Sequence, residues 1–453
     1  MTVGGRGVVS SWIRLLAVCL LVACIATAGA AGAHRVSSTI GALALPAQSG
    51  KLTLVQQGQA PPPDAVCRAR IGVPCYSPQE IQHAYDVDSL LNVGWNGTGQ
   101  TIVIVDSFGS PTIADDLKVF DADFGLPDPP SFKVLSPLGA VPFDPTNGDM
   151  VGWAAETTLD VEWAHAMAPN ASIVLLTSPV SETEGVQGMP EFLALEQYAL
   201  DHHLGQVISQ SWGATENTLF DPTGRQVFDD FEALYARAAA QKVTVLASTG
   251  DVGSAGFDLN GDFYPFPVVG FPASSPLVTA VGGTSLIADT GGNYQSESVW
   301  DDANGATGGG VSQVFTEPAY QLTLPRGAQA TLHGHRGIPD ISWNAGTPIL
   351  VYLSFMRPGY YLFGGTSEGA PQWAGLVADM NQLLGHPIGF LNPYLYALGP
   401  LNAFTGVYHD VTVGDNGFAG VPGYPATPGW DASTGEGTPN AGKLVRAIAA
   451  LAH

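Results

Sequence analysis

The residue best placed by its sequence context to act as a nucleophile is Ser367, in the stretch FGGTSEGAPQWAGLV that covers residues 363–377. The glycines around it give G-x-S-x-G, the pattern in which esterases hold a serine on a sharp turn. The same letters also give Gly-Thr-Ser with Pro371 four residues on, the pattern of another class of serine hydrolase. A third interpretation is a serine that only caps a helix. The partners that each chemistry requires distinguish these interpretations.

The esterase interpretation makes a demand on chain order, because the acid and the histidine of an esterase follow the serine. His386, His409 and His453 follow Ser367, and His453 is the C-terminal residue. The sequence lacks the HGGG segment that contributes to an esterase's oxyanion hole. In a chain with 56 glycines, a serine between two glycines also arises easily by chance. The sequence therefore disfavours an esterase.

A pair of carboxylates offers a different base. The Gly-Thr-Ser pattern with Pro371 is that of the serine loop in subtilisin-like peptidases, which also require a histidine in an H-G-T-H segment. That segment is absent. The sequence at the corresponding place is GWAAETTLDVEWAHAMAPNASI. Glu156 and Asp160 are four residues apart there, so a helix puts both on one face. Close carboxyl groups share a proton, and such a pair serves as a general base in acid, where imidazole is protonated. The alternative for each residue alone is a solvated helix face.

An ordered set of motifs makes a resemblance specific. ETTLDVEWAHAMAP is followed by SQSWG, STGDVGS, FPASSPLVTAVGGTSL, TGGGVSQVF, RGIPDISWNAG and GGTSEGAP. In this order they resemble the sedolisin family, the serine-carboxyl peptidases, from about Tyr76 to Ala449. The resemblance implies a subtilisin-like α/β fold and peptide-bond hydrolysis.

The resemblance assigns a role to each candidate catalytic residue. It implies that Ser367 is the nucleophile, Glu156 its general base and Asp160 the residue that orients Glu156. It also implies that Asp251, in STGDVGS, stabilises the oxyanion, which a carboxyl group can do only when it is protonated and donates a hydrogen bond. Both the base pair and Asp251 therefore predict activity confined to acid. The alternative for Asp251 alone is a turn residue.

Two further segments resemble binding elements of the family. Ser211, Trp212 and Gly213 would pair with the substrate backbone as a strand edge does, although Trp212 is also suited to simple core packing. The stretch from Tyr408 to Asn440 resembles the family's calcium loop, since calcium takes six or more oxygen ligands. The resemblance implies one Ca²⁺ ion, and the matching positions are Asp410 and Asp431, through their side chains, with the carbonyls of Val411, Thr427 and Gly429. An ordinary Gly/Asp turn is the alternative.

Hydrophobic runs predict the elements that position these residues. Residues 101–109, 171–178, 207–213 and 243–251 read as buried parallel strands, and helical stretches lie between them. Strand and helix in series predict a doubly wound, mainly parallel α/β sheet flanked by helices, in a single catalytic domain. Catalytic groups should then gather where the strands end.

The composition of the chain limits the classes of binding partner that can be expected. The chain has 453 residues, 12% charged and 45% hydrophobic, and a net charge of −24. Such a charge disfavours nucleic acid and anionic membranes as partners, and few cations limit positive self-repulsion in acid. An acidic surface that serves solubility explains the charge equally well. We expect a monomer that acts on polypeptide substrates and has no stable membrane partner.

The N-terminus predicts export. Arg6 and Arg14 precede an apolar run and small residues, which indicates a signal peptide over residues 1–33. A retained anchor, or a lipoprotein with a modified Cys24, are the alternatives. Residues 34–75 read as a short flexible leader and 76–453 as the peptidase domain, so the large prodomain usual in the family is not expected. In an exported chain Cys67 and Cys75 most simply pair.

The serine loop departs from the family at one point. Glu368 and Gly369 stand where small residues such as Ala and Ser are common, and Glu368 either disturbs the electrostatics of the nucleophile or points to solvent. Asp106, at the end of a predicted strand, has no evident partner. The sequence predicts a secreted, acid-acting serine-carboxyl endopeptidase. The alternatives are a secreted non-catalytic peptide-binding protein on a peptidase scaffold and, third, an esterase.

Overall fold

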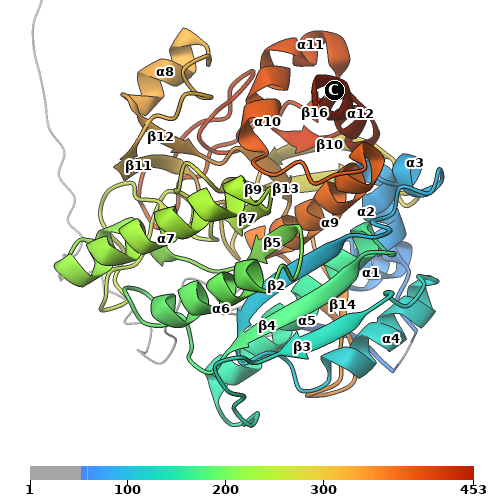
Figure 1. Cartoon of the computed structure of the whole chain (residues 1–453). Coiled ribbons are helices and arrows are strands. Elements are labelled where there is room, and N and C mark those ends of the chain that lie inside the picture. The colour runs from blue at the N-terminus through green and yellow to red at the C-terminus, as the bar shows by residue number, and fades with distance from the viewer. Residues whose placement is uncertain (1–52, 59, 453) are drawn as a thin grey trace, which may run out of the picture. The chain divides into compact units, whose positions relative to one another are not determined.

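A computed structural model of the chain describes residues 53–58 and 60–452, and a mainly parallel sheet lies at its centre (Figure 1). The strand order in this eight-stranded sheet is β10-β9-β7-β5-β2-β4-β3, with β13 paired to β9. β10 alone runs antiparallel to its neighbour. The strands are β2 (Thr101–Ser107), β3 (Phe132–Leu135), β4 (Ser172–Ser178), β5 (Val207–Gln210), β7 (Thr244–Ser248), β9 (Thr279–Ala288), β10 (Tyr294–Val299) and β13 (Ile341–Asn344).

Alternate residues of each central strand face opposite layers of helices, because side chains alternate across a strand. In β2, Ile102 and Ile104 belong to one hydrophobic core, and Val103 and Val105 to the other. Both faces are therefore buried, which explains why β2 reads as a continuous apolar run. The four predicted strands are confirmed as β2, β4, β5 and β7, which are neighbours in the sheet.

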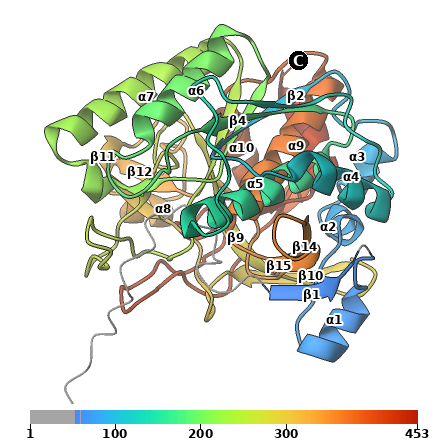
Figure 2. The same ribbon diagram turned by 90° about the horizontal axis from the view of Figure 1, so that it is seen from below.

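Helices cover both faces of the sheet. Figure 2 shows α6 (Met189–Asp201) and α7 (Pro222–Ala240) on one side, and α5 (Gly148–Met167) and α9 (Thr366–Leu384) on the other. This arrangement confirms the predicted doubly wound α/β architecture. The other helices are α1 (Asp64–Ile71), α2 (Pro78–Ala84), α3 (Asp88–Leu91), α4 (Ile113–Phe124), α8 (Arg326–Leu332), α10 (Asn392–Leu398), α11 (Asn402–Thr405) and α12 (Ala441–Ala452), with short 3₁₀ turns η1 (Glu216–Leu219) and η2 (Gly399–Leu401).

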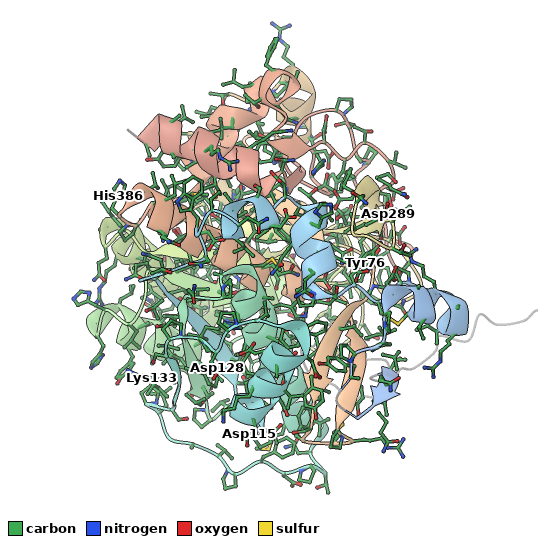
Figure 3. The ribbon with its side chains drawn as sticks, turned by 90° about the vertical axis from the view of Figure 1, so that its right-hand side faces the viewer. Tyr76, Asp115, Asp128, Lys133, Asp289 and His386 are labelled. Atoms are coloured by element: carbon green, nitrogen blue, oxygen red, sulfur yellow. A yellow bond between two sulfur atoms is a disulfide. The ribbon has the colours of Figure 1, made fainter. Side chains whose placement is uncertain are left out.

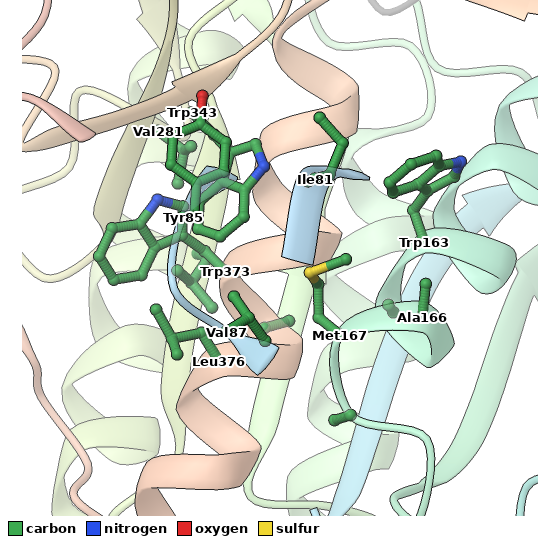
Figure 4. Packing of buried hydrophobic residues seen from close by; sticks show 14 of the residues in the cluster. Ile81, Tyr85, Val87, Trp163, Ala166, Met167, Val281, Trp343, Trp373 and Leu376 are labelled. Carbon is green, nitrogen blue, oxygen red and sulfur yellow. The ribbon is translucent and has the colours of Figure 1, made fainter. Parts of the chain in front are cut away.

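Close packing of α5 on α9 sets the position of the two helices that carry the predicted nucleophile and base. A Cβ atom on Gly375 of α9 would lie 2.6 Å from the Cβ of Met167 on α5, so only glycine permits this approach. Trp373 and Leu376 continue the α9 side of the core (Figure 4). The backbone of one helix therefore fixes the height and rotation of the other.

The second part of the expected flexible leader contains a strand and a helix, which corrects the expectation of flexibility for these residues. β1 (Thr53–Gln57) pairs antiparallel with β15 (Gly359–Phe363), which pairs with β14 (Ile349–Leu353). Cys67 of α1 forms the expected disulfide with Cys75, beside Tyr76 (Figure 3). Backbone hydrogen bonds and the cross-link hold this segment, although its composition resembles that of a linker. The smaller strands are β6 (Ala214–Thr215), β8 (Gly270–Phe271), β11 (Gly310–Thr316), β12 (His335–Ile338), β16 (Tyr408–His409) and β17 (Thr438–Pro439).

The predicted signal peptide, including Cys24, and the first part of the leader lie outside the described residues. Among the helices of the described part, none is both long enough and apolar enough to cross a membrane.

Candidate active site

The two predicted base residues are completely buried on α5. Glu156 and Asp160 have no exposed surface, so the alternative of a solvated helix face is wrong. The Ser211 hydroxyl, just beyond the end of β5, donates a hydrogen bond of 3.0 Å to Oδ1 of Asp160. It also lies 3.4 Å from the backbone oxygen of Ser367. Ser211 thus links the acid pair to the start of α9.

Ser367 is the second residue of α9 and is 4% exposed. β15 ends at Phe363, and Gly364 and Gly365 then turn the chain into the helix. Gly365 has a φ of 110°, a conformation that favours glycine. The serine therefore sits at a strand-to-helix turn, where a nucleophile is accessible from the sheet edge.

Asp251 lies close to the same turn. It follows β7, and its Oδ1 accepts hydrogen bonds from the Thr366 amide at 2.8 Å and from the Thr366 hydroxyl at 2.9 Å. The residue next to the nucleophile is thus tied to the predicted oxyanion residue. Sequence analysis did not identify Thr366, whose side chain makes this link.

A cavity with a volume of about 40 Å³ lies beside Ser367. It lies at the ends of β5 and β7, where ligands bind in doubly wound folds. The three predicted substrate-binding residues and both Asp251 and Ser367 line it. The full lining is Ser211, Trp212, Gly213, Thr215, Ser248, Thr249, Gly250, Asp251, Val252, Gly253, Ala255, Val268, Val269, Gly270, Phe271, Gly309, Thr366 and Ser367.

The Trp212 side chain has a packing role. It is 1% exposed, and its ring centroid lies 4.5 Å from that of Phe192 and 5.9 Å from that of Phe231. A Cβ atom on Gly213 would lie 2.7 Å from the Phe271 carbonyl oxygen, so a side chain there would collide with the backbone. The segment therefore combines an anchored aromatic ring with a bare backbone edge.

Burial dominates the electrostatics of the acid pair. It raises the pKa of Glu156 well above the ordinary value, the charges of Asp106 and Asp251 add to the rise, and a hydrogen bond with Ser367 opposes it. The pKa of Asp160 is also raised well above its ordinary value, by burial and then by the charges of Asp106 and Glu156. Burial therefore favours the protonated form of each group, and because their titrations are coupled the pair shares its protons.

Asp106 lies close enough to Glu156 and Asp160 for its charge to raise their pKa values, a relationship that sequence analysis did not identify. It lies near the end of β2, is fully buried, and its pKa is raised to about 7 by burial. A signal was present in the sequence. Ile102, Ile104 and Asp106 alternate on one side of β2, and that side faces α5.

No histidine lines the cavity beside Ser367. His386 is exposed (Figure 3), and the ring of His409 stacks on Tyr294, with its pKa lowered to about 4 by burial. His453 lies outside the described residues. The described part of the chain thus offers Ser367 carboxyl groups as its bases, and the esterase interpretation lacks its histidine.

Four of the five predicted calcium residues make pairwise contacts within the loop between β16 and β17. The Gly429 amide donates to both carboxylate oxygens of Asp410 at 3.1 Å, and the Thr427 amide donates to Oδ2 of Asp431 at 2.9 Å. In the described residues there is no cluster of three or more His, Cys, Asp or Glu side chains suited to a metal. A donor set of two carboxylates and backbone carbonyls nevertheless fits calcium, which accepts carbonyl oxygens and water.

Comparisons with known proteins follow the same motifs. No protein-family profile matches the chain. Kumamolisin from Bacillus sp. (strain MN-32) is 36% identical over 380 residues, 82% of this chain and 63% of kumamolisin. Sedolisin from Pseudomonas sp. (strain 101) is 35% identical over 54% of this chain and 41% of its own length. Tripeptidyl-peptidase 1 of Dictyostelium discoideum is 29% identical over 84% of this chain and 60% of its own length. The chain thus spans less than two thirds of each relative.

A solved structure supports the same relationship. Pseudomonas sedolisin, a serine-carboxyl proteinase complexed with two molecules of pseudo-iodotyrostatin, superimposes with a TM-score of 0.66 at 29% identity. The superposition covers 82% of this chain and 97% of that structure. The predicted subtilisin-like α/β fold is therefore confirmed.

Proposed function

We propose that this chain, which belongs to the sedolisin family of serine-carboxyl peptidases, is a secreted, acid-acting endopeptidase. The observation that carries the proposal is the buried acid pair, whose member Glu156 interacts electrostatically with Ser367, while no histidine of the described residues lines the cavity beside that serine. A carboxyl pair that shares one proton keeps its other member ionised at a pH where imidazole is protonated, and is therefore suited to act as a base in acid. Residues 1–33 would direct export.

The reaction begins with the Ser367 hydroxyl. Its oxygen attacks the carbonyl carbon of the peptide while Glu156, in its ionised form, takes the hydroxyl proton. Glu156 then gives this proton to the leaving amine, and the peptide bond breaks to leave an acyl-enzyme. Water then attacks the acyl carbon while Glu156 takes a proton from it. The bond to Ser367 breaks, Glu156 returns the proton to the serine oxygen, and the second product leaves with a free carboxyl group. Asp160 shares a proton with Glu156 and sets its orientation.

Asp251 stabilises the negative oxygen formed during each attack. A protonated carboxyl donates a hydrogen bond to that oxygen, and an ionised one repels it. The hydrogen bonds from Thr366 to Oδ1 hold the carboxyl group of Asp251 in place beside the nucleophile. Activity should therefore fall as pH rises and Asp251 loses this proton.

Substrate binding and calcium belong to the same proposal. Ser211, Trp212 and Gly213 pair with the backbone of an extended peptide, and one of its side chains points to the cavity beside Ser367. Asp410 and Asp431, with the carbonyls of Val411, Thr427 and Gly429, hold one Ca²⁺ ion, which ties together the two ends of the loop between β16 and β17. The ion supplies stability and takes no part in the reaction.

Digestion of casein between pH 2.5 and 8 tests the proposal, with Ser367→Ala and Glu156→Gln as matched variants. We expect a maximum in acid that both variants lose, and mass spectrometry of the fragments should show internal cleavage. Release of tripeptides alone would support exo-action, as in the relatives named tripeptidyl-peptidases. A maximum near neutral pH would refute the acid-pair mechanism. Peptide binding without hydrolysis at any pH would instead favour a non-catalytic binding protein.

A further inference from the structure

Glu368, the residue after the nucleophile, is buried in a way that the sequence did not predict. It has no exposed surface, so the expectation that it points to solvent is wrong. Asn344, the last residue of β13, donates a hydrogen bond from Nδ2 to Oε1 of Glu368. The first turn of α9 is thereby joined to the central sheet.

The orientation of Asn344 is fixed by its other contacts. Its Oδ1 accepts from the amides of Leu286 at 3.2 Å and Thr347 at 3.3 Å, so its Nδ2 must be the donor toward Glu368. Nδ2 also donates to the Thr347 carbonyl at 2.7 Å. Asn344 is therefore a rigid donor, and Oε1 of Glu368 is held as an acceptor.

Ser367 lies between two anchored neighbours. On one side Thr366 is bound through its amide and hydroxyl to Asp251, and the Gly250 amide donates to the Thr366 hydroxyl at 3.0 Å. On the other side Glu368 is bound to Asn344. The two anchors come from the loop after β7 and from β13, so the turn that presents Ser367 is held from two directions.

Glu368 fills its place as a neutral group. Asp251 is the titratable group that faces it. Burial first, and then the charge of Asp251 when that group is ionised, raise the pKa of Glu368 well above its ordinary value. Asn344 from β13 and Gln372 from α9 itself are neutral. A charged Glu368 would also compete with the negative oxygen that forms near Ser367 for the positive end of α9.

We propose that Glu368 is a positioning residue for the acyl-transfer reaction, in which its uncharged side chain ties the first turn of α9 to Asn344 and so fixes the direction of the Ser367 hydroxyl. This inference rests on the proposed peptidase function. It gives a structural role to Glu368, which stands where a small residue is common in the family. Glu368 does not touch the substrate. It acts on the reaction through Ser367.

Three substitutions separate positioning from packing. Glu368→Gln keeps the acceptor for Asn344 in a neutral side chain of the same shape, and should keep kcat within about 3-fold. Glu368→Met keeps the buried length but cannot accept the hydrogen bond, and Glu368→Ala also removes the bulk. Both should lower kcat by about 10²-fold, the loss associated with a displacement of about 1 Å at a reacting group, with KM nearly unchanged.

Glu162→Ala is the matched control, because Glu162 is also fully buried and accepts one hydrogen bond, from the Tyr352 amide at 3.0 Å. It should lower the unfolding temperature without lowering kcat per folded molecule. All assays are made well below the unfolding temperatures at the pH optimum of the unmodified enzyme, on protein whose folded fraction is measured by circular dichroism.

The outcomes are distinct. Glu368→Met with unchanged kcat would overturn the inference, as would Glu368→Gln with a loss as large as that of Glu368→Ala. A loss of stability alone in all three variants would reduce Glu368 to a packing residue and refute the positioning role. Failure of the proposed function shows differently, as an unmodified chain no more active than Ser367→Ala.

Discussion

Replacement of Glu196 by glutamine should stabilise the protein at pH 7 but not at pH 4. Glu196 lies on α6, is fully buried, and accepts a hydrogen bond from Nε2 of Gln210, at the end of β5. Burial raises the pKa of Glu196 to about 8, and the hydrogen bond from Gln210 opposes part of that rise. The folded protein therefore keeps this carboxyl group protonated at both pH values.

The magnitude follows from the proton that unfolding releases. In the unfolded chain the carboxyl has a pKa of about 4.3, and each pH unit above it favours release by about 1.4 kcal/mol. A pKa raised by folding contributes stability that is complete below about pH 4 and is lost as pH rises toward about 8. At pH 7 this loss amounts to about 3–4 kcal/mol. Glutamine has no proton to release, so the variant escapes the loss.

Urea unfolding followed by tryptophan fluorescence at pH 4 and pH 7 measures the effect. Both proteins carry Ser367→Ala so that self-digestion does not distort the transition. Asp229→Asn, at an exposed position on α7, is the control and should change stability equally at the two pH values. A change in the free energy of unfolding from Glu196→Gln that is the same at both pH values would refute the assignment of a buried, protonated carboxyl group.

Two other predictions test the site and its support. Asp251→Ala should lower kcat by about 10²–10³-fold with little change in KM, since it removes an oxyanion donor, and a variant with normal kcat in acid would exclude that role. Removal of calcium by a chelator should lower the unfolding temperature. An ion present at 100 times its Kd adds about 2.7 kcal/mol to the free energy of unfolding, and this contribution would be lost. The same treatment should have no effect on Asp431→Asn, and an equal effect on both proteins would place the ion elsewhere.

The sequence by itself determined the chemical groups and their order along the chain. The motif series identified the family, and the β-branched runs located β2, β4, β5 and β7, because strands buried on both faces need continuous apolar sequence. The ends of such strands lie at one edge of a parallel sheet. The sequence therefore also predicted that catalytic groups would gather at that edge.

Only the tertiary structure decided which carboxyl groups are buried. In α5, sixteen residues from Met150 to Met167 are buried on all sides of the helix, so the sequence offers no polar face from which to judge Glu156 and Asp160. Asp106 joins them because β2 packs under α5, and Glu368 turns inward because Asn344, 24 residues away, supplies a donor. Burial and long-range partners set the charge of each group, and neither is a property of local sequence.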